Sequence, residues 1–252
     1  MISRKNIARF GHDPGLVMVV ARRWLPWAAR RRDPECRHLI EAWSSGSAPR
    51  VDFVSLFPSV DDIDVALRKP EHRVVGWSLD LQELVRLLVI LKATAANKVL
   101  EIGTYDGFTA LNIAANLPDG GEVATLDLPQ DGDEAALRAG GLSNAITSGI
   151  VGEKFRNEPE AAKIRQIWGN SAEIDWASFG GPFDMIFIDG SHDYKYVKSD
   201  SLKAIQHVRP GGTILWHDYG QAVDVSRAVD EIAQTYPVKA ILGTRFACLR
   251  MP

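Results

Sequence analysis

The chain has 252 residues, of which 46% are hydrophobic and 24% are charged, a composition typical of a globular protein. This length predicts one α/β domain with an extension. The net charge of −3 gives no general basis for nucleic-acid binding, although residues 1–50 carry a net +6 and the remainder a net −9. No apolar run reaches the length of a membrane span, and the apolar stretch Gly15 to Val20 is too short for a signal peptide.

The two cysteines, Cys36 and Cys248, lie far apart in the sequence. This spacing predicts neither a disulfide framework nor a metal-binding knuckle. Because a reducing compartment suits a chain of this kind, we expect a cytoplasmic protein.

Residues 1–75 are predicted to form a helical N-terminal extension or cap. One helix is expected to begin at Asp33-Pro34, and a short second helix is expected from Asp61 to Leu67. Arginine and tryptophan residues cluster between residues 22 and 32. Two interpretations stay open: weak peripheral contact of residues 16–32 with a membrane or an anionic partner, or a small helical cap packed on the main domain.

A second unit is predicted from residue 76 to residue 252. An amphipathic helix over residues 78–92 precedes a regular alternation of short apolar runs and helical patterns. Strands are expected at 99–102, 122–126, 164–168, 183–188, 213–216, 238–242 and 246–250, and helices at 107–116, 194–207 and 223–235. This order predicts a seven-stranded, mostly parallel sheet with helices on both faces. The long segment 129–162 is expected to fold partly over the site as a lid.

Four predicted strands carry an acidic residue at or beside their carboxyl end: Glu101, Asp127, Asp189 and Asp218. Ligands of an open parallel sheet lie beyond these ends, so the acids are expected to surround one ligand. The first strand leads into Glu-x-Gly-x-x-x-Gly and not into the dinucleotide pattern G-x-G-x-x-G, which disfavours nicotinamide and flavin cofactors. A carboxylate at Glu101 favours a ligand with a positively charged end.

Three segments resemble motifs of the class I S-adenosylmethionine-dependent methyltransferases, which have a Rossmann-like α/β fold. The segment Glu101-Ile-Gly-Thr-Tyr-Asp-Gly-Phe-Thr is similar to motif I of the catechol and caffeoyl-CoA type O-methyltransferases, with Tyr105 as the subgroup marker. Residues 183–194 and 209–219 look like the fourth and fifth strand motifs of bacterial sugar and natural-product O-methyltransferases. The resemblance covers residues 76–252 and says little about residues 1–75.

The resemblance implies S-adenosyl-L-methionine as the cofactor and assigns residues to it. Asp127 is expected to accept hydrogen bonds from the ribose hydroxyls, and Ser171 to lie beside the adenine. Glu101 is expected to support the glycine loop near the amino group of the methionine end. The full set of expected cofactor-binding residues is Glu101, Gly103, Thr104, Tyr105, Gly107, Asp127, Ser171 and Asp189.

A divalent cation is a further expectation. Asp189 and Asp218 end neighbouring strands in the family's sheet order and could share Mg²⁺. The family's third ligand is changed here, because Tyr219 follows Asp218 and His217 precedes it. With His217 as a third ligand, the site would shift toward transition metals.

The function predicted from these residues is transfer of a methyl group to a hydroxyl of a small acceptor, a sugar or natural product. Candidates for the base that takes the hydroxyl proton are His192, His217 and Lys195. The alternatives are a metal-independent N-methyltransferase and a non-catalytic protein that docks to a membrane or partner. The resemblance also allows a homodimer.

Overall fold

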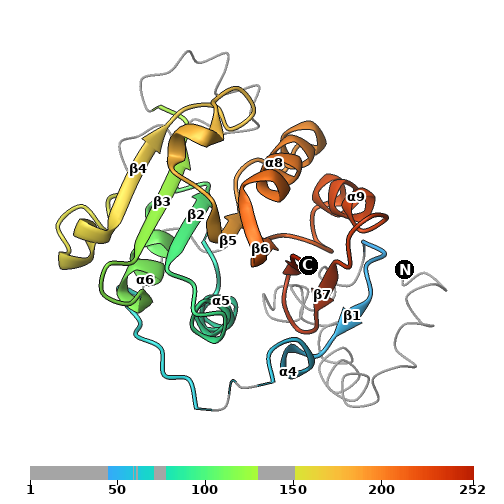
Figure 1. Cartoon of the computed structure of the whole chain (residues 1–252), viewed down its shortest axis with the longest axis horizontal. Coiled ribbons are helices and arrows are strands. Elements are labelled where there is room, and N and C mark those ends of the chain that lie inside the picture. The colour runs from blue at the N-terminus through green and yellow to red at the C-terminus, as the bar shows by residue number, and fades with distance from the viewer. Residues whose placement is uncertain (1–44, 59, 61, 71–77, 130–150) are drawn as a thin grey trace, which may run out of the picture.

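A computed structural model of the chain describes residues 45–58, 60, 62–70, 78–129 and 151–252. Its centre is one eight-stranded sheet in the order β1-β7-β8-β6-β5-β2-β3-β4 (Figure 1). The strands are β1 (Arg50–Val51), β2 (Lys98–Ile102), β3 (Glu122–Asp127), β4 (Ile164–Trp168), β5 (Phe183–Ile188), β6 (Val208–Trp216), β7 (Lys239–Ile241) and β8 (Ala247–Arg250). β8 is antiparallel to β6 and β7, and the other pairings are parallel.

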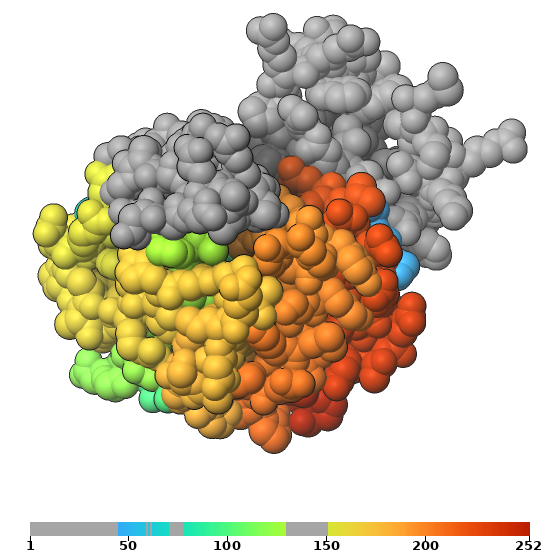
Figure 2. Space-filling view, turned by 90° about the horizontal axis from the view of Figure 1, so that it is seen from above, coloured from blue at the N-terminus to red at the C-terminus, as the bar shows by residue number. Residues whose placement is uncertain are grey.

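This sheet confirms the predicted Rossmann-like class and corrects the strand count from seven to eight. The additional strand, β1, comes from residues assigned to the N-terminal extension and pairs with β7 through Arg50↔Ala240 and Val51↔Ile241. Figure 1 shows this blue strand beside the red one, although the two are far apart in the sequence. Figure 2 shows β4 and the C-terminal elements toward opposite ends of the body, as the strand order requires.

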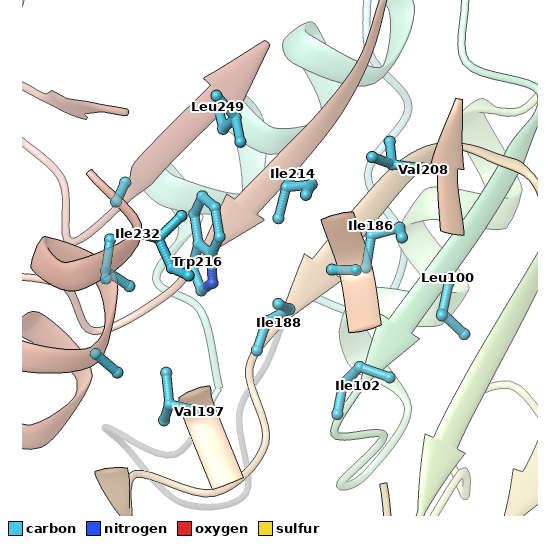
Figure 3. Close-up of a cluster of buried hydrophobic side chains, with 14 of the residues drawn as sticks. Leu100, Ile102, Ile186, Ile188, Val197, Val208, Ile214, Trp216, Ile232 and Leu249 are labelled. Carbon is cyan, nitrogen blue, oxygen red and sulfur yellow. The ribbon is translucent and has the colours of Figure 1, made fainter. Parts of the chain in front are cut away.

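Helices cover both faces of the sheet: α5 (Leu81–Ala93) and α6 (Phe108–Asn116) on one, α8 (Tyr194–His207) and α9 (Val223–Ile232) on the other. Successive strand residues point to opposite faces. In β5, Ile186 and Ile188 belong to the core under α8 and α9, whereas Met185 and Phe187 belong to the core under α5 and α6. Figure 3 shows the first core, where Val197 of α8 and Ile232 of α9 approach Trp216 and Ile188.

The predicted helix over residues 61–67 is wrong for its described part, because residues 62–70 contain no helix. Their backbone groups bond to two asparagine side chains one turn apart on α6. Asn116 accepts from Ala66 N–H and donates to Ala66 C=O, and Asn112 makes the same pair of bonds with Arg68. These side chains satisfy the backbone without a helix. We call residues 62–70 the strap.

The remaining described elements are the short helix α4 (Phe53–Leu56) and two 3₁₀ helices, η1 (Pro159–Lys163) and η2 (Trp176–Phe179). The helix expected from Asp33, the Arg/Trp segment at 22–32, and the larger part of the 129–162 segment lie outside the described residues. Among the helices that the structure describes, none has the length and apolarity that crossing a membrane requires.

Candidate active site

The glycine loop between β2 and α6 lies at the carboxyl edge of the sheet. Its residues Gly103, Tyr105 and Gly107 have φ angles of 99°, 47° and 84°, a left-handed region that favours glycine and costs energy at tyrosine. A Cβ at Gly103 would lie 2.1 Å from the carbonyl oxygen of Asp189. Only glycine therefore allows the ends of β2 and β5 to approach this closely.

Asp127, at the end of β3, holds this loop in place. One carboxylate oxygen accepts from the backbone N–H groups of Thr104 and Tyr105, at 3.0 and 2.8 Å, and the other accepts from Leu128 N–H at 2.8 Å. Burial raises the pKa of Asp127, and these three amides oppose that rise. Each oxygen keeps acceptor capacity beyond the amides, so Asp127 can also accept from a ligand hydroxyl.

Glu101 lies in β2 beneath the loop and is fully buried. Its Oε2 accepts a short hydrogen bond from Thr125, whose hydroxyl also lies 2.7 Å from that of Thr104. Burial raises the pKa of Glu101 well above its ordinary value. Its Oε1 has no hydrogen-bond partner among the described residues. This buried oxygen can accept a hydrogen bond from a positively charged ligand end that carries N–H donors.

A second group of residues lies at the ends of β5 and β6, which are adjacent parallel strands. Ligand atoms of Asp189, His192 and Asp218 lie within 4.8 Å of one another. His192 Nε2 is 2.8 Å from Asp218 Oδ2, and the His192 side chain is 60% exposed. We call these three residues the strand-end cluster. It combines an open imidazole with two carboxylates, which can hold a cation or move a proton.

His217 lies below this cluster and is buried. Its Nδ1 is 2.9 Å from Asp189 and 3.5 Å from Asp218, and its Nε2 is 3.1 Å from Glu83. Burial lowers the pKa of His217, but the three carboxylates together raise it well above the ordinary value. Both ring nitrogens of His217 face carboxylates, so neither is open toward the surface, and His217 is not among the three residues whose ligand atoms gather at the cluster.

Sequence reasoning missed two residues that complete this network, Glu83 of α5 and Arg245. Arg245 contacts Glu83 through Nε at 3.1 Å and Nη2 at 2.5 Å, and its Nη1 donates to Asp218 at 2.9 Å. Burial opposes ionisation, yet His217 and Arg245 lower the pKa of Glu83 to about 2. The available signal was a carboxylate on the otherwise apolar buried face of α5.

Asp218 has a φ angle of 54°, so the chain turns sharply at the end of β6. This turn lets His217 and Asp218, which would point to opposite faces in an extended strand, both approach Asp189. Burial raises the pKa of Asp218, but His217, His192 and Arg245 lower it to well below its ordinary value. Asp218 is therefore held as a carboxylate by its contacts with His192, His217 and Arg245.

Three other residues that the sequence singled out, Lys195, Ser171 and Tyr219, make contacts with residues outside the strand-end cluster. The ammonium of Lys195 lies 5.0 Å from the ring centroid of Tyr196, and its side chain is exposed. Ser171, after β4, accepts from Lys203 Nζ and Trp176 Nε1 through its carbonyl oxygen. The Tyr219 hydroxyl does not bond to Asp189 or Asp218. It donates to Asp230 at 2.6 Å and accepts from Ala48 N–H.

Residues 100–219 match the model of a family described as a methyltransferase domain. Caffeoyl-CoA O-methyltransferase 3 from Nicotiana tabacum is 28% identical over 131 residues, which are 51% of this chain and 48% of that protein. Caffeoyl-CoA O-methyltransferase 2 from Zea mays is 28% identical over 51% of this chain and 44% of that protein. The chain thus spans about half the length of the curated relatives it matches.

Two solved structures show the same fold. The O-methyltransferase TomG from Streptomyces achromogenes, solved in complex with SAM, has a TM-score of 0.52 and is 16% identical over 79% of this chain and 96% of that one. The O-methyltransferase NovP has a TM-score of 0.51 and is 17% identical, covering 68% of this chain and 78% of that one.

Proposed function

We propose that this chain, whose residues 100–219 match the model of a methyltransferase domain, transfers a methyl group from S-adenosyl-L-methionine to a hydroxyl of a small acceptor. One observation carries the proposal: the glycine loop, tied to Asp127, lies against the strand that ends in Asp189. A ligand on the loop therefore has its reactive end beside the strand-end cluster. The relatives' names, which are those of O-methyltransferases, support a hydroxyl over an amine.

The described residues fit S-adenosylmethionine at several points. Asp127 has acceptor capacity for the ribose hydroxyls, and the buried Oε1 of Glu101 is an unpaired acceptor beneath the loop. The absence of a side chain at Gly103 lets the loop backbone lie against Asp189. Ser171 follows β4, the neighbour of β3, where the adenine is expected. When bound, the cofactor supplies a sulfonium methyl group as the electrophile.

We propose His192 as the base that accepts the hydroxyl proton. If Nε2–H donates to Asp218 Oδ2 at 2.8 Å, the tautomer leaves Nδ1 as the proton acceptor. Asp218 holds the ring and balances the charge that His192 gains on protonation. The rest of the catalysis is positioning, because methyl transfer needs the oxygen, methyl and sulfur atoms in line.

Asp189 and Asp218 are also the residues that would hold a divalent cation. Their oxygens suit Mg²⁺, which prefers oxygen ligands. A cation there would lower the pKa of an acceptor hydroxyl bound to it. His192 can then act either as a third ligand or as the base, but it cannot do both with the same nitrogen.

Calorimetry with S-adenosylhomocysteine tests the cofactor assignment directly. We expect binding by the wild type and a large loss in Gly103→Ala, whose Cβ would displace the loop from Asp189. Gly120→Ala is the matched control, since that glycine also has a positive φ but an added Cβ meets nothing within 4 Å. Absence of binding to the wild type at millimolar ligand would refute the function. A panel of sugar and phenolic acceptors with labelled methyl donor then searches for the substrate.

We also propose a cytoplasmic location, a homodimer and weak peripheral membrane contact. A cytoplasmic location is supported by the two distant cysteines, of which Cys248 is free and buried. A homodimer and peripheral membrane contact through residues 16–32 rest on the sequence alone. Size-exclusion chromatography with light scattering and liposome pelleting test them respectively.

A further inference from the structure

Residues 151–155, which belong to the long segment 129–162, pack directly against the glycine loop. Gly152 N–H donates to Tyr105 C=O at 2.8 Å, and Lys154 N–H donates to Asp106 C=O at 2.9 Å. The contact is tight, because a Cβ at Gly107 would lie 2.5 Å from the ring of Phe155. We call residues 151–155 the clasp. It contacts the loop at Tyr105, Asp106 and Gly107.

Lys154 adds a charged contact to this backbone pairing. Its Nζ lies 3.1 Å from Asp106 Oδ2, and the two side chains are 11% and 3% exposed. The same ammonium lies 4.4 Å from the centroid of the Phe108 ring, at the start of α6. Asp106 Oδ1 accepts from Phe108 N–H at 3.0 Å. Asp106 therefore joins the loop, the first turn of α6 and Lys154 in one buried arrangement.

The clasp also affects the backbone N–H groups of Thr104 and Tyr105, which belong to the expected cofactor-binding loop. Tyr105 has a left-handed backbone, which the surrounding contacts must stabilise. Its carbonyl is fixed by Gly152, and its N–H, with that of Thr104, meets Asp127. Loss of the clasp would let the loop relax and would move Asp127 and the loop amides apart.

We propose that Lys154 is a positioning residue for the methyl donor: by holding Asp106, it keeps the loop from Gly103 to Gly107 in the conformation that binds S-adenosylmethionine. This inference rests on the proposed function. The strap connects to the same point, because Lys69 Nζ donates to Lys154 C=O at 2.8 Å and pairs with Glu158 at 2.7 Å. The strap thus contacts the clasp, which in turn contacts the glycine loop.

The test compares Lys154→Met, Lys154→Arg and the wild type by calorimetry with S-adenosylhomocysteine. We expect affinity to fall about tenfold in Lys154→Met, because only a fraction of molecules would keep the binding conformation. Lys154→Arg, which keeps the charge, should restore affinity to within about threefold of the wild type. Lys98→Met, which removes an ion pair to Glu122 at the amino ends of β2 and β3, away from the loop at their carboxyl ends, is the matched control and should bind normally.

Asp106→Asn, alone and with Lys154→Met, completes a double-mutant cycle. We expect the double variant to bind no more weakly than the weaker single variant. Equal affinity of Lys154→Met and wild type, or a loss that Lys154→Arg does not restore, would overturn the inference and leave the function intact. If Lys154→Met does not fold, the affinities of Lys154→Gln and Asp106→Asn for S-adenosylhomocysteine are compared with that of the wild type in its place. If the wild type itself does not bind, the proposed function fails, and the inference fails with it.

Discussion

Glu83 and Arg245, which are 162 residues apart in the sequence, form a two-point ion pair beneath the strand-end cluster. The Arg245 backbone N–H also donates to Glu83, at 2.7 Å. The pair joins helix α5 to the turn before β8 and, through Arg245 Nη1, reaches Asp218. The orientation of a candidate catalytic carboxylate therefore depends on a helix that precedes the first central strand.

Arg245→Met should destabilise the protein by about 3–5 kcal/mol, because the substitution removes one partner of a buried ion pair and leaves Glu83 with His217 alone. Urea unfolding followed by circular dichroism measures this loss. Lys198→Met, which removes a partly exposed pair with Glu231, is the control and should cost less than about 1 kcal/mol. Similar losses in the two variants would mean that the buried network does not stabilise the fold.

His192→Gln should slow methyl transfer about 10²- to 10⁴-fold, the usual contribution of a positioned base. Binding of S-adenosylhomocysteine should not change, because His192 lies outside the glycine loop. Single-turnover transfer to an acceptor found by screening is the measurement. His207→Gln is the control, since that ring bonds to Lys203 C=O on α8. A rate unchanged by His192→Gln would exclude the residue as the base.

Removal of divalent cations should lower activity, and added Mg²⁺ should restore it. Asp189→Asn should weaken cation binding, since it removes one of two carboxylates at the cluster. If His192 is the base and not a ligand, His192→Gln should leave cation affinity unchanged while the rate falls. Activity that survives both exhaustive chelation and Asp189→Asn would show that the two acids do not act through a metal.

Asp200 should make stability depend on pH. It is buried on α8, one oxygen has no partner among the described residues, and burial raises its pKa to about 7. The folded state therefore holds a proton that the unfolded state releases near pH 4. Asp200 makes no unfavourable contribution below that pH, and its charged form reduces stability as the pH rises to about 7, by at most about 4 kcal/mol.

Asp200→Asn should remove this loss, so that the variant is more stable than the wild type at pH 8 and similar to it at pH 4. Urea unfolding at several pH values measures the difference. Asp184→Asn is the control with the opposite sign. Burial raises the pKa of Asp184, but Arg209 and two backbone amides lower it overall, so its stabilising contribution is present at neutral pH and lost in acid. Parallel curves for Asp200→Asn and wild type would contradict the assignment.

The central sheet could be predicted because each central strand is a short apolar run bounded by turn residues. The span of β4 was predicted to the residue, and β5 likewise, from Phe183 to Ile188. The strap could not be predicted, because its backbone partners are the side chains of Asn112 and Asn116, far along the chain. The two-residue strand β1 is too short to leave a pattern.

For the site, the acids at strand ends follow from topology, since parallel strands bring their carboxyl ends to one edge. What the sequence could not supply was the direction of each side chain. The left-handed turn at Asp218 brings His217 inward against Glu83, while the loop after β5 brings His192 to Asp218. Neither position follows from the order of the residues alone.

The pairing of β1 with β7 has a consequence for how the protein folds. Arg50 meets Ala240, so this edge of the sheet joins residues near opposite ends of the described chain. Contacts between residues so distant in sequence form slowly, because a long loop must close before they contribute. During synthesis, residues 50–51 leave the ribosome long before their partner strand exists. We therefore expect the edge of β7 to close late in folding, and an open strand edge can pair with a strand of another molecule.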